Sequence, residues 1–369
     1  MQKHLIVLSG FFIAVILSRV IIPRILIISL RKRLFDAPDV RKVHKKPVSR
    51  LGGVSFFPAI LFTLTLVTGF CVIRDFGNTL ADTIDHWTQM LFLCSGLTLL
   101  FIVGIADDLI GVRYRQKFLV QIIVSAMLPL SGLYLNDFYG LFGIHEIPSC
   151  IGIPLTMLLT VFITNAVNLI DGIDGLASGL SMVALLAFGV LAVMDVRWMS
   201  ALLSFTTMGV LLPFFYYNVF GNADRGRKIF MGDTGSLTLG YILSFLTVQY
   251  TMNTYEEGIN YEGAMLISFS VLLVPCLDVI RVVLGRVRRG KDPFMPDKTH
   301  IHHKFLALGF TPRRAMISIL CISFLFCVCN VVLVSCLNNT VLFLCDVVVW
   351  TLMNLYISRL ISRRNSSEV

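Results

Sequence analysis

The sequence predicts an all-α, polytopic membrane protein with about eleven transmembrane helices. Hydrophobic residues make up 56% of the 369 residues and charged residues only 14%, whereas a soluble domain of this size carries roughly a quarter charged residues. The apolar residues also form uninterrupted runs instead of alternating with polar ones. A run of about 17–25 such residues can cross the hydrocarbon layer as a helix, so a large soluble core is excluded.

The predicted spans follow one another along the whole chain. No linker, internal repeat or long polar tail separates them, so we expect one integral-membrane domain over residues 1–369. In the ninth run, Pro275 predicts a kink, and Asp278 and Arg281 are spaced to pair on one helix face. The runs are residues 5–30, 54–73, 90–106, 118–135, 151–169, 176–194, 199–219, 236–250, 264–283, 315–337 and 341–361.

Positive charges predict the orientation of these spans. With the N-terminus outside, about 25 of the 31 Lys and Arg residues fall on the inside and roughly three in outside loops, a strong positive-inside bias. The topology is therefore expected to be N-out and C-in. This topology and anionic membrane lipids explain the net charge of +9 without a nucleic-acid partner.

Polar residues gather in the segments that this topology places inside. The clusters richest in acidic, amide, glycine and histidine residues are 43–53, 106–117, 165–175, 231–236 and 293–303. Five segments from across the chain therefore converge on one membrane face. The pattern predicts one composite site at the cytoplasmic boundary.

Two of these clusters are acidic. Asp107 and Asp108 are adjacent, and neighbouring carboxylates need a cation nearby or a raised pKa; a solvated helix end is the plainer alternative. Asn165, Asn168, Asp171 and Asp174 are spaced by three, which keeps them near one helix face. Helix packing would explain the two amides alone, but the full run NAVNLIDGIDGLA is harder to explain in that way.

Two further inside clusters suit phosphate chemistry. Asp233 lies in MGDTGSLTLG at an expected helix N-terminus, where a carboxylate can hold Mg²⁺ that bridges to phosphate; a simple capping role is the alternative. Arg286 begins the loop RVRRGKDPFMPDKTHIHHKF, which is typical of a phosphate clamp, although some arginines serve as positive-inside anchors. His300, His302 and His303 lack a fourth ligand at zinc spacing.

Carboxylates for a hard metal, basic groups and helix N-termini together indicate phosphoryl chemistry. The chain has no GxxxxGK[ST] motif, which excludes an ATP-driven pump of that type. The segments RKVHKKPVSRLGG, GIADDLIG, NAVNLIDGIDGLASG, MGDTGSL and PDKTHIHHKF stand in this order. With them the sequence resembles the polyprenyl-phosphate N-acetylhexosamine-1-phosphate transferases (glycosyltransferase family 4), which include the translocase of the first peptidoglycan lipid intermediate.

The resemblance implies a cytoplasm-facing, Mg²⁺-dependent enzyme, with Mn²⁺ as an alternative ion. A lipid phosphate, by default undecaprenyl phosphate, attacks the β-phosphorus of a UDP-sugar and releases UMP. It also implies a bacterial cytoplasmic membrane location, the first step of a cell-surface polysaccharide and, by analogy, a homodimer. The implied catalytic residues are Asp107, Asp108, Asp174 and His300; the metal ligands are Asp233 and Asn168; and the substrate-binding residues are Arg50, Lys117, Asn165, Asn168, Asp171, Arg286, His302 and His303.

Several alternatives stay open at this point. The loop reads HIHH instead of three consecutive histidines, which favours the GlcNAc branch over a translocase that uses UDP-MurNAc-pentapeptide. Another UDP-N-acetylhexosamine, such as UDP-GalNAc, is a third possibility, and the downstream polymer is undetermined among O-antigen, capsule, teichoic acid and glycoprotein. Arg115 could replace Lys117 as the expected lysine. A secondary transporter is a distant rival, because transporter sites usually lie near the membrane midplane.

Overall fold

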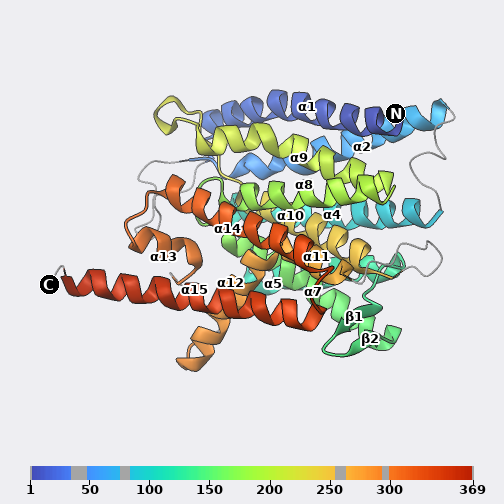
Figure 1. Cartoon of the computed structure of the whole chain (residues 1–369). Coiled ribbons are helices and arrows are strands. Elements are labelled where there is room, and N and C mark those ends of the chain that lie inside the picture. Colours follow the sequence, from blue (N-terminus) through green and yellow to red (C-terminus); the bar gives the residue numbers. More distant parts are fainter. Residues whose placement is uncertain (1, 35–47, 75–83, 254–262, 293–298, 368–369) are drawn as a thin grey trace.

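The computed structural model describes residues 2–34, 48–74, 84–253, 263–292 and 299–367. The segments RKVHKKP and PFMPDK, which belong to two of the expected motifs, lie outside the described residues. The long helices run side by side as one bundle, with the N- and C-termini at opposite ends (Figure 1).

Most of the predicted spans form long helices. In the described part of the chain, eight helices are long and apolar enough to cross a membrane, and a bent pair would make a ninth. This confirms a polytopic helical membrane protein, while the count of eleven stays a prediction. The eight are α1 (Gln2–Lys32), α2 (Phe56–Ile73), α4 (Ile84–Ile110), α7 (Ser149–Ile170), α8 (Leu176–Met194), α9 (Trp198–Val219), α14 (Pro312–Leu333) and α15 (Asn339–Ser367).

The bent pair is α11 (Ala264–Ser270) and α12 (Leu273–Arg288), whose axes differ by 76°. Pro275 lies in the first turn of α12, where its missing N–H weakens the connection to the preceding turn. The kink expected in this run is therefore present, slightly before the proline.

Two predicted spans differ from simple apolar helices. The run 118–135 is divided into α5 (Tyr114–Ser125) and the short α6 (Met127–Leu130). The run 236–250 belongs to α10 (Gly232–Thr251), in which every residue from Thr234 to Thr251 is buried. Several hydroxyl groups of α10 donate to the carbonyl four residues earlier, which satisfies them without water. A polar helix can therefore occupy the interior of the bundle.

Two glycines bring α10 close to its neighbours. A Cβ at Gly240 would lie 2.6 Å from Cα of Thr164 in α7, and one at Gly104 would lie 2.5 Å from Cα of Thr234. Any larger residue would push α7 or α4 away from α10. The close packing brings the ends of α4 and α7 to the first turn of α10.

The two ends of the bundle carry different small elements. A hairpin of β1 (Asp137–Leu141) and β2 (Ile144–Glu146), which the hydrophobic pattern did not predict, lies at the end with the N-terminus. The signature histidines lie in and just before α13 (Ile301–Ala307), toward the end with the C-terminus (Figure 1). Two 3₁₀ turns, η1 (Leu51–Ser55) and η2 (Ala223–Arg225), complete the structure.

Candidate active site

The first turn of α10 is held by the segment that precedes α2. The N–H of Phe230 donates to the Ser49 carbonyl at 2.7 Å, and the N–H of Gly53 donates to the Met231 carbonyl at 2.8 Å. A Cβ at Gly53 would overlap the backbone of Gly235, so only glycine allows this approach. The expected motif around Leu51–Gly53 therefore forms the support of the MGDTGSL motif.

Asp108 binds the N-terminus of α10. Its carboxylate accepts hydrogen bonds from the N–H of Asp233 at 2.8 Å, and from the N–H and hydroxyl of Thr234 at 3.0 and 2.6 Å. Gly232, with φ of +68°, leaves no room for a Cβ, which would lie 2.6 Å from the Asp108 carboxylate. Asp108 thus caps the N-terminus of α10, a helix distant from it in sequence. Through these hydrogen bonds it also orients Asp233, which lies in the first turn of that helix.

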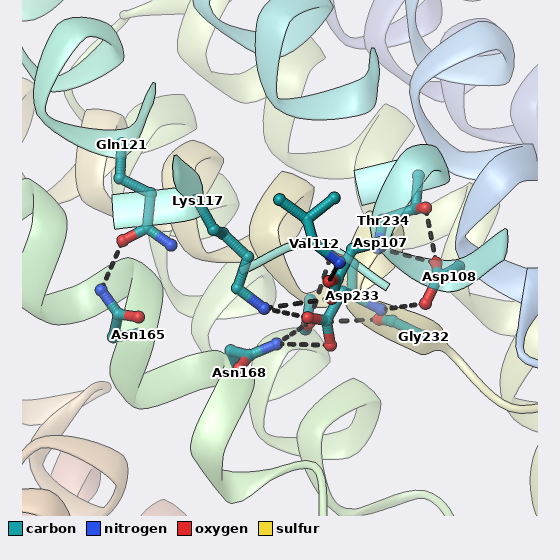
Figure 2. A network of polar contacts seen from close by, with 11 residues as sticks. Asp107, Asp108, Val112, Lys117, Gln121, Asn165, Asn168, Gly232, Asp233 and Thr234 are labelled. Atoms are coloured by element: carbon teal, nitrogen blue, oxygen red, sulfur yellow. Dashed lines mark hydrogen bonds and ion pairs between the residues drawn. The ribbon is translucent and has the colours of Figure 1, made fainter. Parts of the chain in front are cut away.

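Asp107 has other partners. Its carboxylate accepts from the N–H of Val112 at 2.6 Å and from Nζ of Lys117 at 3.3 Å. The same Nζ pairs with the Asp233 carboxylate (Figure 2). Arg115 instead donates to the hydroxyl of Tyr114 at 3.1 Å and is exposed. Of the two residues that the sequence left open, Lys117 is therefore the one that contacts these carboxylates.

Asn168 completes this cluster from α7. Its Nδ2 donates to Asp233 at 3.1 Å and to the hydroxyl of Ser236 at 2.8 Å (Figure 2). Asp107, Lys117, Asn168 and Asp233 come from α4, α5, α7 and α10. Four helices thus bring two carboxylates, an amide and an ammonium group to one place, as the sequence predicted.

Asn165 lies apart from the carboxylates. Its Nδ2 donates to Oε1 of Gln121 at 2.5 Å and to the Val161 carbonyl at 2.8 Å, on the side of the network away from Asp108 (Figure 2). These contacts tie α7 to α5. The substrate-binding role expected for Asn165 stays a prediction.

The turn after α7 is fixed to the loop that precedes α10. The Gly175 N–H donates to Oδ1 of Asn218 at 2.6 Å, and Nδ2 of Asn218 donates to the Ile229 carbonyl at 2.8 Å. Asp174 pairs with Lys228 at 2.6 Å. No motif singled out Asn218 or Lys228, because Asn218 lies at the end of an apolar run and Lys228 is one of many inside cations.

Asp171 is surrounded by negative charge. Burial raises the pKa of Asp171 to about 7, with smaller contributions from the carboxylates of Asp233, Asp174 and Asp108. The cation of Arg50 acts in the opposite direction. These interactions place Asp171 and Arg50 beside the cluster. An acidic site with this much mutual repulsion favours binding of a cation.

The signature histidines pack against the same turn. A Cβ at Gly172 would overlap the imidazole of His302, and the rings of His302 and His303 are 4.2 Å apart. Burial, together with His303 and His300, lowers the pKa of His302 to about 3, so His302 is neutral. Arg286 is buried in the last turn of α12. The histidine motif and the NLIDGIDG motif are therefore neighbours in space.

The donor set fits Mg²⁺ better than zinc. Among the described residues, no group of three or more His, Cys, Asp or Glu side chains could hold a metal ion. Mg²⁺, however, is commonly held by one or two carboxylates together with substrate phosphates and water. Asp233, whose carboxylate accepts from Nδ2 of Asn168, could supply such a carboxylate.

Comparisons with known proteins find relatives along most of the chain. Residues 90–251 match glycosyl transferase family 4. Over 335 residues the chain is 31% identical to a Bacillus subtilis (strain 168) protein named "probable undecaprenyl-phosphate N-acetylglucosaminyl 1-phosphate transferase", with 90% of this chain and 87% of that protein covered. Proteins named undecaprenyl-phosphate alpha-N-acetylglucosaminyl 1-phosphate transferase are 32% identical in Yersinia pestis and 30% in Escherichia coli (strain K12). These two alignments cover 79% and 78% of this chain, and 74% and 72% of those proteins.

Proposed function

Because this chain belongs to glycosyl transferase family 4, we propose that it transfers GlcNAc-1-phosphate from UDP-GlcNAc to undecaprenyl phosphate and releases UMP. The sugar and the lipid acceptor follow from the names of its relatives. The observation that carries the proposal is the cluster of Asp107, Lys117, Asn168 and Asp233, which joins four helices at one end of the bundle.

The cluster suits transfer between two phosphates. Lys117 supplies a fixed positive charge between two carboxylates and can contact a phosphate oxygen when substrate enters. Asp107 orients Lys117, and Asn168 orients Asp233. Mg²⁺ held by Asp233 and Asn168 would offset the charge of the donor diphosphate and of the leaving UMP. Binding both substrates at one boundary removes much of the entropic barrier.

Other residues are proposed to hold the donor. Arg50 and Arg286 are suited to phosphate oxygens, and His300, His302 and His303 lie next to the turn that carries Asp171 and Asp174. The ion pair with Lys228 holds Asp174 in that turn. In this proposal Asp108 positions Asp233 through the first turn of α10 and does not itself contact the reactants.

The proposal includes a cellular setting. We place the chain in the bacterial cytoplasmic membrane, N-out and C-in, with the cluster on the cytosolic side, where UDP-sugars are made. The hairpin and α13 lie toward opposite ends of the bundle, in agreement with the loops expected outside and inside. The reaction would begin a cell-surface polysaccharide, and a homodimer is proposed by analogy.

The test is UMP release by detergent-purified protein with undecaprenyl phosphate, Mg²⁺ and a panel of UDP-sugars. We expect UMP from UDP-GlcNAc that depends on lipid and metal and is lost in Asp233→Ala. Release only with UDP-MurNAc-pentapeptide would reassign the chain to the peptidoglycan step. No release from any donor by well-folded protein would overturn the proposal and favour a transporter.

A further inference from the structure

A buried carboxylate on α12 holds the entry to the signature helix α13. The Asp278 side chain is fully buried. One of its oxygens, Oδ1, accepts from Nη2 of Arg281 at 2.7 Å and from the N–H of Ile301 at 3.0 Å, while Oδ2 is 2.8 Å from Nδ1 of His300. Arg281 also donates to the Thr299 carbonyl at 2.6 Å. The backbone and the first histidine of the motif are therefore bound to one acidic side chain.

We propose that Asp278 is a positioning residue that sets the orientation and tautomer of His300; its effect on catalysis rests on the proposed function. An ionised carboxylate has only acceptors, and the adjacent guanidinium of Arg281 compensates its buried charge. Nδ1 of His300 must then carry the proton that is shared with Oδ2. In the neutral imidazole, Nε2 is then the nitrogen that can accept a hydrogen bond or a proton from the substrate.

The same contact fixes the neighbouring histidine. The rings of His300 and His302 are parallel, with an interplanar angle of 4° and centroids 5.9 Å apart. His302 in turn packs against Gly172, in the turn that carries Asp171 and Asp174. Asp278 is thus the fixed end of a row of side chains that leads from α12 to the acidic turn. A change in the orientation of the His300 ring would therefore shift His302 and the turn that is proposed to face the donor.

The geometry predicts what Asp278→Asn does. The two donors Arg281 and Ile301 both point at Oδ1, so the amide oxygen of asparagine takes that position. The amide NH₂ must then face Nδ1 of His300, which becomes an acceptor. The imidazole proton moves to Nε2, and the nitrogen presented to the substrate changes from acceptor to donor. The substitution changes the shape of the side chain very little but exchanges one tautomer of His300 for the other.

The experiment has a spectroscopic part that does not need activity. Protein labelled with ¹⁵N-histidine in detergent gives long-range ¹H–¹⁵N spectra, in which His300→Gln identifies the His300 signals. We expect the Nδ1–H tautomer in the unmodified protein and the Nε2–H tautomer in Asp278→Asn. If His300 carries its proton on Nε2 in the unmodified protein, or does not respond to Asp278→Asn, the proposal is wrong.

The kinetic part asks whether Asp278 acts through His300. We expect kcat/KM for UDP-GlcNAc to fall about 10- to 100-fold in Asp278→Asn, and Asp278→Asn/His300→Gln to match His300→Gln within about twofold, since the two act as one unit. If the double variant instead lost activity by the product of the two single losses, Asp278 would not act through His300. The matched control is Asp346→Asn, a buried carboxylate of α15 that accepts from Asn330 at 2.8 Å; it should retain activity. Without UMP release by the unmodified protein, the proposed function fails, while the spectra still decide the tautomer.

Discussion

Asp108→Asn tests whether the second residue of the acidic pair contacts reactants or only holds a helix. The carboxylate accepts three hydrogen bonds from the first turn of α10. In asparagine one oxygen becomes an NH₂ group. The oxygen that remains can serve either Asp233 or Thr234, so in both placements one backbone N–H faces another donor.

The magnitude follows from that count. A buried donor left without an acceptor costs about 1–3 kcal/mol, and a hydrogen bond to a charged acceptor contributes about 1.5–3 kcal/mol. We therefore expect the first turn of α10 to lose about 2–3 kcal/mol. If this displaces Asp233, the loss corresponds to a factor of about 30–150, since about 1.36 kcal/mol is tenfold.

The assay is UMP release as a function of Mg²⁺ concentration. We expect Asp108→Asn to need about 30- to 150-fold more Mg²⁺ and to recover most of its rate at saturation, because only the position of Asp233 has changed. Asp107→Asn is the comparison: Asp107 contacts Lys117, so its loss of rate should persist at saturating Mg²⁺. An Asp108→Asn variant with an unchanged Mg²⁺ requirement and a low maximal rate would refute the reasoning and favour a general base.

Three further predictions concern residues around the cluster. Lys117→Met should lower UMP release about 100-fold or more, because it removes the cation between two carboxylates; Arg115→Met, at an exposed position, is the control and should retain activity. Gly172→Ala should abolish turnover but leave the protein monodisperse in size-exclusion chromatography, since the new methyl group overlaps His302; full activity would contradict that contact. Thermal unfolding should show the unmodified protein losing about 1.4 kcal/mol of stability relative to His302→Gln for each pH unit between about pH 6.5 and about pH 3, because this histidine binds a proton in the unfolded state but stays neutral in the folded state, where its pKa is about 3. Parallel pH profiles of the two proteins would contradict a buried neutral imidazole.

Part of the site could be predicted because residue types and their spacing are local. Asp107, Asn168 and Asp233 were recognised from their motifs, and the structure places them together. The contacts of Asn165 could not be predicted from its motif. Its spacing from Asn168 is that of one helix face, but the structure pairs it with Gln121, a residue that no motif singled out.

Supporting residues were harder to predict for a physical reason. Asn218 and Lys228 act on a turn that lies about fifty residues away, and Lys304 in α13 donates to Asn354 and Ser358 of α15. Asp278 was expected to pair with Arg281, which the structure confirms. That it also holds His300 depends on how α12 packs beside α13, which no spacing within either segment reports.

By itself the sequence determined that the chain is a helical membrane protein and which segments hold the polar motifs, because hydrophobic runs and motif composition are properties of each segment alone. Only the tertiary structure decided which partners each residue of the acidic pair contacts. Asp107 and Asp108 are adjacent, but successive helical residues point about 100° apart, so one meets Lys117 and the other the first turn of α10. Those partners come from helices distant in the chain, and only the packing of α4, α5 and α10 brings them within hydrogen-bond distance.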